Sequence, residues 1–111
     1  MNKEFNCPVE ATISLIGGKY KSVILFHLMR KTLRYSELHK KIPKATDKML
    51  AQQLRELEKD GLIKRTVYPV VPPKTEYNLT EFGESLSPIL NAMCNWGESY
   101  LNIPSQCVEE S

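Results

Sequence analysis

The stretch that decides the fold runs from residue 46 to residue 68 and is written TDKMLAQQLRELEKDGLIKRTVY. Leu50, Leu54 and Leu57 recur at the spacing of one face of a helix. Thr46 precedes this pattern as a typical helix N-cap, and Gly61 follows it as a stop signal. Residues 62–68 then alternate in side-chain type, which predicts a strand directly after a helix that ends near residue 60.

The side of this helix opposite the leucines is polar and mostly cationic. At about 100° per residue, the side chains roughly 140–200° away from Leu50 are those of Lys48, Gln52, Arg55 and Lys59. Arg and Lys suit phosphates and guanine edges, and Gln suits adenine. An ordinary amphipathic helix with a solvated face would also show this pattern, so the surrounding sequence has to decide between the two.

The charge of the chain is unevenly distributed and favours a nucleic-acid surface around this helix. The 111 residues carry a net charge of only +2. Residues 30–75 hold twelve Lys and Arg against five Asp and Glu, whereas residues 76–111 hold six acids and no base. A basic middle segment is the electrostatic pattern expected of a protein that contacts phosphates.

Upstream of the deciding stretch, the pattern predicts three helices. Residues 35–42 form a short helix with Leu38 inward, and a turn at residues 43–45 follows it. Residues 19–31 are apolar around nearly the whole circumference, which predicts burial against both the domain and a second subunit. Residues 8–16 form the first helix, with Pro8 at its first position and Gly17-Gly18 at its end.

Downstream, residues 74–79 predict a second strand, joined to the first by a proline-rich tip. Thr80 caps a last helical stretch over residues 80–101, which Pro88 should kink or split. This stretch has two apolar strips. The first strip comprises Phe82, Leu86, Ile89, Met93, Trp96 and Tyr100, and the second comprises Leu90, Cys94, Gly97 and Leu101. One strip can pack on the domain, and the other needs a partner, most simply the same helix of a second subunit.

Length and composition limit the classes of protein. A chain of this length fits one domain. We see neither a run of about 20 apolar residues nor a secretory signal, which predicts no membrane partner. Three cysteines cannot all pair within one chain, so we expect a reducing cytoplasm. His27 and His39 sit in no catalytic motif, and no Cys or His pair has tight metal-ligand spacing. We therefore predict no enzyme, no metal and no cofactor.

The order of elements predicts a mainly α-helical fold with a small β-hairpin. A helix-turn-helix at about residues 35–60 followed by a hairpin at about 62–79 is a winged helix-turn-helix domain. The helices at about 8–16, 19–31 and 80–101 would be dimerisation helices. The whole chain, residues 1–111, would then be a single domain.

Several motifs in this order resemble the HxlR-type branch of the MarR-like winged-helix transcriptional regulators. They include Cys7-Pro8-Val9-Glu10, Gly17-Gly18-Lys19, Arg34-Tyr35-Ser36-Glu37-Leu38, Leu54-Arg55-Glu56-Leu57-Glu58, Pro72-Pro73-Lys74 and Trp96-Gly97. The resemblance covers residues 7–101 and implies a small cytoplasmic homodimer that binds operator DNA. Tyr20 departs from the family, which usually has Trp there, and Lys44-Ala45-Thr46 departs from its usual small-residue turn.

The resemblance makes residues 46–60 the recognition helix and assigns DNA contacts around it. Groove contacts are expected from the N-terminal half of this helix, backbone contacts from its second half and from the start of the preceding helix, and further contacts from the base of the wing. The expected contact residues are Arg34, Tyr35, Thr46, Lys48, Gln52, Gln53, Arg55, Lys59, Lys64, Arg65 and Lys74. The expected dimer contacts are Leu90, Cys94, Trp96, Gly97, Tyr100 and Leu101, although Trp96 would fit a core equally well.

Cys7 is a candidate redox or electrophile sensor. It precedes Pro8 at the start of a helix, where the positive end of the helix dipole favours a thiolate. The resembled family includes members that sense oxidants or electrophiles at this motif position. Cys107 in the tail could form a disulfide with Cys7 of the other subunit, although both thiols could equally be incidental.

The sequence therefore predicts a sequence-specific regulator that binds double-stranded operator DNA as a homodimer, and we interpret it as a repressor. A winged-helix regulator that senses a metal or a small ligand is one alternative. A winged-helix module that binds only protein is the other, and the cationic helix face argues against it.

Overall fold

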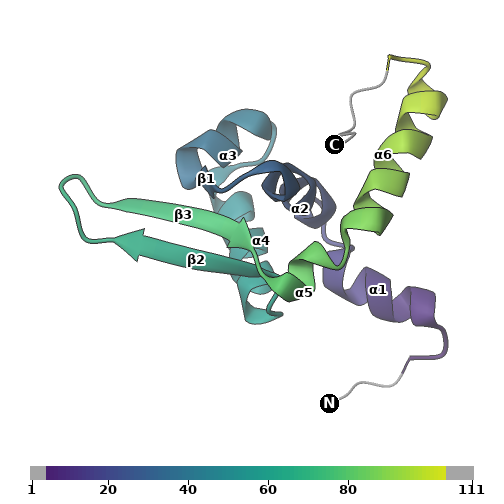
Figure 1. Cartoon of the computed structure of the whole chain (residues 1–111), viewed down its shortest axis with the longest axis horizontal. Helices are drawn as coiled ribbons and strands as arrows, with labels where there is room; N and C mark the ends of the chain where they lie inside the picture. Colours follow the sequence, from purple (N-terminus) through teal and green to yellow (C-terminus); the bar gives the residue numbers. More distant parts are fainter. Residues whose placement is uncertain (1–4, 105–111) are drawn as a thin grey trace.

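The computed structural model describes residues 5–104, which form six helices and a three-stranded sheet (Figure 1). The elements in chain order are α1 (Pro8–Ile16), α2 (Lys21–Arg30), β1 (Leu33–Arg34), α3 (Tyr35–Lys41), α4 (Asp47–Lys59), β2 (Ile63–Tyr68), β3 (Lys74–Leu79), α5 (Glu81–Glu84) and α6 (Ser87–Leu101). This is the predicted winged helix-turn-helix fold. Among residues 5–104, no helix has the length and apolarity that a membrane crossing requires.

The sheet is antiparallel, with the strand order β1-β3-β2. Strands β2 and β3 pair from Ile63 opposite Leu79 to Tyr68 opposite Lys74, and they project from the body as the wing (Figure 1). Strand β1 was not predicted, because two residues are too few to show alternation. It pairs Leu33 with Tyr77 and so attaches the start of the helix-turn-helix to the base of the wing.

The core lies between α2, α4 and the base of the sheet. Leu50, Leu54 and Leu57 are almost fully buried, as the helical spacing predicted. Helix α2 is buried on the side that packs within this protomer. Ile24, Leu25 and Leu28 are buried, whereas Val23 is 40% exposed, so the burial of the other side against a second subunit stays a prediction.

The predicted helix ends are confirmed by their caps. The Thr46 Oγ1 atom accepts a hydrogen bond from the Met49 amide at 3.1 Å, and Thr80 Oγ1 accepts one from the Gly83 amide at 3.0 Å. Gly61 has a φ of +79°, a conformation that favours glycine after a helix. Pro88 lies in the first turn of α6, so the last helical stretch is split into α5 and α6.

Helix α6 packs on the domain only through its beginning and then leaves the body (Figure 1). Leu90 is 2% exposed and belongs to the core, so its predicted place in a dimer interface is wrong. The two strips are also distributed differently from the prediction. Leu86 and Leu90 together face the domain, whereas the remainder of the first strip, from Ile89 to Tyr100, is exposed.

Candidate nucleic-acid interface

The outer face of α4 is made by the exposed side chains of Lys48, Gln52, Arg55 and Lys59. This face continues onto the wing, because Arg55 on α4 and Arg65 on β2 line one groove between the two elements. Thr46 is exposed at the N-terminal end of α4 as its cap, and a helix N-terminus with free amides attracts phosphate. Cations and amide donors therefore share one surface.

Gln53 does not belong to this surface, so its predicted contact with DNA is corrected. Gln53 is only 9% exposed, and its Oε1 atom accepts a hydrogen bond from the Tyr20 backbone amide at 3.0 Å. The signal was present in the sequence, since Gln53 lies about 60° from Leu50 around the helix, on the buried side. Gln53 instead fastens α4 to the corner between α1 and α2.

Tyr35 is oriented by the helix that follows the turn. Its hydroxyl donates a hydrogen bond to Asp47 Oδ1 at 2.8 Å, and burial together with this bond raises the pKa of Tyr35 to about 12. His39 Nδ1 lies 3.1 Å from the same oxygen, and His39 Nε2 lies 2.8 Å from the Ala45 carbonyl oxygen. The predicted phosphate contact of Tyr35 would compete with this bond. The sequence pattern did not indicate His39 and Asp47 as partners, because they lie on opposite sides of the turn.

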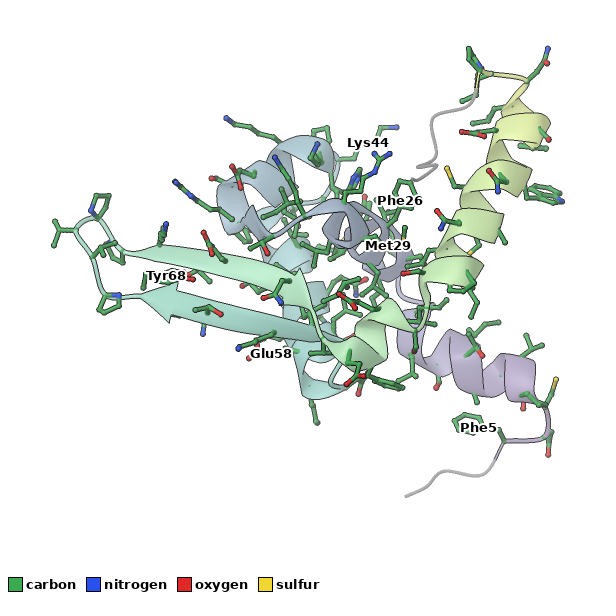
Figure 2. All side chains as sticks on the ribbon, viewed as in Figure 1. Phe5, Phe26, Met29, Lys44, Glu58 and Tyr68 are labelled. Atoms are coloured by element: carbon green, nitrogen blue, oxygen red, sulfur yellow. The ribbon has the colours of Figure 1, made fainter. Side chains whose placement is uncertain are left out.

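The basic residues of the wing lie at its two ends. Lys64 and Arg65 are exposed near the body, opposite Asn78 and Tyr77, as predicted. Lys74 was predicted at the base of the wing, but the register places it opposite Tyr68 at the far end. Figure 2 shows Tyr68 on the wing, away from the helices, and Lys74 Nζ lies 4.9 Å from the centre of its ring.

Arg34 marks the start of α3 and is exposed. Its backbone amide donates a hydrogen bond to Glu37 Oε1 at 2.8 Å, and this bond holds the pKa of the Glu37 carboxyl below its usual value. Arg34 itself lies at the corner between the wing and α3, where β1 pairs with β3.

An ion pair between the buried Lys21 and the half-exposed Glu56 lies beside the outer face of α4. Lys21 is 7% exposed, and its Nζ atom lies 2.7 Å from Glu56 Oε1. The other carboxylate oxygen, Glu56 Oε2, accepts a hydrogen bond from Gln52 Nε2 at 3.2 Å. Lys21 and, to a smaller extent, Gln52 hold the pKa of Glu56 below its usual value. The sequence pattern indicated neither Lys21 nor Glu56 as part of this site, because they belong to helices that are distant in sequence.

Comparison with known proteins identifies the family of this chain. The model of the HxlR-like helix-turn-helix family matches residues 15–105. The chain belongs to the HxlR-like helix-turn-helix family. A curated relative, the uncharacterised HTH-type transcriptional regulator YdeP of Bacillus subtilis (strain 168), is 54% identical over 94 residues, which are 85% of this chain and 73% of YdeP. The chain is accordingly a transcriptional regulator of the helix-turn-helix type.

Two solved structures similar to this HxlR-like regulator capture one protein in two redox states. The redox regulator HypR in its oxidised form has a TM-score of 0.81 and 50% identity, covering 84% of this chain and 96% of HypR. Its reduced form has a TM-score of 0.82 and 48% identity, covering 86% and 95% respectively. The winged-helix arrangement described above is therefore shared with a characterised regulator.

The HxlR-like chain also exposes an apolar surface on α1 and α6, remote from the wing (Figure 1). The members of this α1–α6 surface are Val9, Ile13, Ile89, Met93, Trp96, Tyr100 and Leu101, each at least 40% exposed. The rings of Trp96 and Tyr100 stack with centroids 5.5 Å apart, and Trp96 is 70% exposed, so it is not a core residue of this protomer. Gly97 adjoins them, and a Cβ atom there would meet nothing within 4 Å.

The cysteines of this HxlR-like regulator differ in their surroundings. Cys7 is exposed at the N-cap of α1, where its carbonyl oxygen accepts a hydrogen bond from the Glu10 amide at 2.9 Å. Cys94 is half-buried and lines a groove with Phe26 between α6 and α2. Cys107 lies outside residues 5–104. Within those residues, no group of three or more His, Cys, Asp or Glu side chains could hold a metal.

Proposed function

We propose that this regulator binds double-stranded operator DNA in a sequence-specific manner, as a homodimer, and represses the genes it controls. The observation that carries this proposal is the outer face of α4. Four long polar side chains project from the exposed side of a helix whose opposite side is buried, and Arg65 at the base of the wing lies beside them. Side chains of this kind on a helix-turn-helix are those that contact base edges and phosphates in a major groove.

Within the proposal, residues of α4 have different tasks. Thr46, Lys48 and Gln52 belong to the N-terminal half of the helix and face base edges, since recognition helices enter the groove by that end. Arg55 and Lys59 contact phosphates, as do Arg34, Lys64 and Arg65 around them. Lys74 reaches the backbone farther along the DNA, because it lies at the far end of the wing.

The homodimer in this proposal forms through the α1–α6 surface. Exposed apolar patches of several large side chains are unusual on monomers and mark interaction sites. A two-fold dimer presents two copies of α4, and these would read half-sites about 10–10.5 base pairs apart, centre to centre. Repression then follows from occupancy of an operator that overlaps a promoter.

Selection of binding fragments from the protein's own genome, followed by sequencing, tests the proposal. We expect a pseudo-palindromic site to be enriched, and transcription in vitro from a promoter that contains it to fall. Gln52→Ala should lower affinity for the selected site by about 1–3 kcal/mol and leave binding to random DNA unchanged. Lys59→Ala should weaken binding to both DNAs and make the slope of log affinity against log salt concentration shallower by about one unit.

Two results would contradict the proposal. A protein that enriches no sequence would be a winged-helix module for another partner. Equal losses for Gln52→Ala and Lys59→Ala on every duplex would show that α4 contacts only the backbone.

The proposal extends to Cys7 as a redox- or electrophile-responsive thiol. Two observations support it: Cys7 is exposed at the start of α1, and HypR, which is half identical to this chain, is described as a redox regulator. A change in α1 would act on the same surface that forms the dimer.

A further inference from the structure

We infer that Lys21 and Glu56 are positioning residues that fix the side-chain amide of Gln52 for base recognition, an inference that rests on the proposed function. Lys21 is buried away from the outer face of α4, and Glu56 borders that face, half-exposed beside Gln52. Both act through Gln52, which is exposed on that face and is hydrogen-bonded to Glu56.

The contacts assign each carboxylate oxygen of Glu56 to one partner. Oε1 lies 2.7 Å from Lys21 Nζ, and Oε2 accepts the hydrogen bond from Gln52 Nε2 at 3.2 Å. An ionised carboxylate can only accept, so it selects the nitrogen of the Gln52 amide and rejects the oxygen. Since Lys21 holds the pKa of Glu56 low, the carboxyl stays ionised at neutral pH.

This assignment matters because of how glutamine recognises adenine. The bidentate pair needs the amide oxygen to accept from N6 and the amide nitrogen to donate to N7. A free glutamine amide can rotate and present the two groups in either order. With one N–H held by Glu56, Gln52 keeps its second N–H and its oxygen available in a fixed order.

Lys21 is suited to hold Glu56 because its ammonium group is itself confined. Its side chain is 9% exposed, and its stem passes over Gly18. A Cβ atom at Gly18 would come within 2.9 Å of Lys21 Cδ and 2.6 Å of Gln53 Oε1. The absence of a side chain at Gly18 thus lets Lys21 reach Glu56 on α4, and it lets the Gln53 side chain of α4 reach the Tyr20 amide.

The alternative is that the ion pair serves stability alone. Lys21 and Glu56 join α2 to α4, and half-exposed ion pairs add little to stability in general. A purely stabilising pair would affect the melting temperature and every DNA sequence alike. A positioning pair would change the ratio of affinities for the selected site and for random DNA.

The first experiment measures that ratio by fluorescence anisotropy for Glu56→Gln and Lys21→Met, with Glu58→Gln as control. Glu58 is exposed on the same helix, so its variant changes the charge of α4 equally. We expect Glu56→Gln and Lys21→Met to lower the ratio by roughly three- to tenfold, and Glu58→Gln to leave it unchanged. In a Gln52→Ala background, Glu56→Gln should lower the ratio no further.

The second experiment needs no DNA and follows the Gln52 side-chain amide by ¹⁵N relaxation in the free protein. Its signals are assigned by their loss in Gln52→Ala. We expect an ordered amide in the wild type and a mobile one in Glu56→Gln and Lys21→Met.

Equal effects of Glu56→Gln and Glu58→Gln on the ratio, or an equally ordered Gln52 amide in Glu56→Gln and the wild type, would overturn the inference. A wild type that binds all duplexes equally would overturn the proposed function instead, and the relaxation data would still decide whether the amide is positioned.

Discussion

Gln52 and Gln53 have the same side chain and adjacent positions, yet they do different work, because one residue of helix turns the side chain by about 100°. Gln52 is exposed on the outer face of α4, and Gln53 is buried against Tyr20. The direction of each could be worked out from the leucine spacing. The partner of Gln53 could not, since a backbone amide 33 residues away leaves no local mark in the sequence.

Gln53→Ala should destabilise the protein by about 1–3 kcal/mol, because it leaves the part-buried Tyr20 amide without its acceptor. Urea unfolding at neutral pH measures the change. Gln52→Ala is the matched control and should alter the free energy of unfolding by less than about 0.5 kcal/mol, as exposed positions usually do. Similar losses of stability in both variants would mean that the hydrogen bond between Gln53 and the Tyr20 amide does not stabilise the fold.

At the scale of elements, the ends of helices were the best-predicted features. Thr46, Gly61 and Thr80 act through bonds or conformations within a few residues, so their signals are local. Strand β1 exists only because β3 pairs with it, and the position of Lys74 depends on the register of β2 with β3. Pairings of this kind are decided by segments distant in sequence, which a pattern within one segment cannot reveal.

A hydrogen bond from the Tyr35 hydroxyl on α3 to the Asp47 carboxylate on α4 joins the two helices of the helix-turn-helix across the turn. The pKa of Tyr35 is raised to about 12 in the folded protein, against about 10 for an unperturbed tyrosine. The unfolded chain therefore loses this proton first as the pH rises. The contribution of the Tyr35 hydroxyl to the free energy of unfolding is therefore complete below about pH 10 and is lost as the pH rises toward 12.

Tyr35→Phe should consequently be less stable than the wild type at pH 9, and the gap should narrow between about pH 10 and pH 12. Urea midpoints measured across this range for both proteins give the gap. The other tyrosines are common to the two proteins, so their ionisation cancels in the difference. A gap that stays constant up to pH 12 would show that the Tyr35 proton is not held by the fold.

On the scale of the whole molecule, the two kinds of surface are separated. The wing lies at one end of the molecule, and α1 and α6 lie at the other, with α6 extending away from the body (Figure 1). The cationic side chains belong to α4 and the wing, and the exposed apolar side chains of the α1–α6 surface belong to the other end. The charge distribution of the sequence predicted the first surface. The second was predicted only in outline, because the split after α5 determines which side of α6 meets the domain, and it places Leu90 inward.

Trp96→Ser should dissociate the proposed dimer, because a large exposed aromatic side chain on such a surface is a typical hot spot worth about 2–4 kcal/mol. Sedimentation equilibrium at micromolar concentration should show a dimer for the wild type and mostly monomer for the variant. Val71→Ser is the control, since Val71 is 99% exposed at the tip of the wing. A wild type that sediments as a monomer would contradict the prediction, as would equal effects of both substitutions.

Oxidation of Cys7 should lower the affinity of the proposed dimer for operator DNA. The thiol is exposed at the start of α1, which is part of the proposed interface, so we expect its modification to change how the two α4 helices of the proposed dimer are placed relative to each other. We expect diamide to lower operator affinity by roughly tenfold or more in the wild type, the usual size of coupling between two sites, and to leave Cys7→Ser unaffected. A non-reducing gel separates two routes of oxidation. If the oxidised wild type forms a covalent dimer and Cys107→Ser does not, a disulfide joins the two subunits. If the oxidised wild type forms no covalent dimer, Cys7 is modified by a small molecule instead. Equal losses of affinity in the wild type and Cys7→Ser would place the sensor elsewhere.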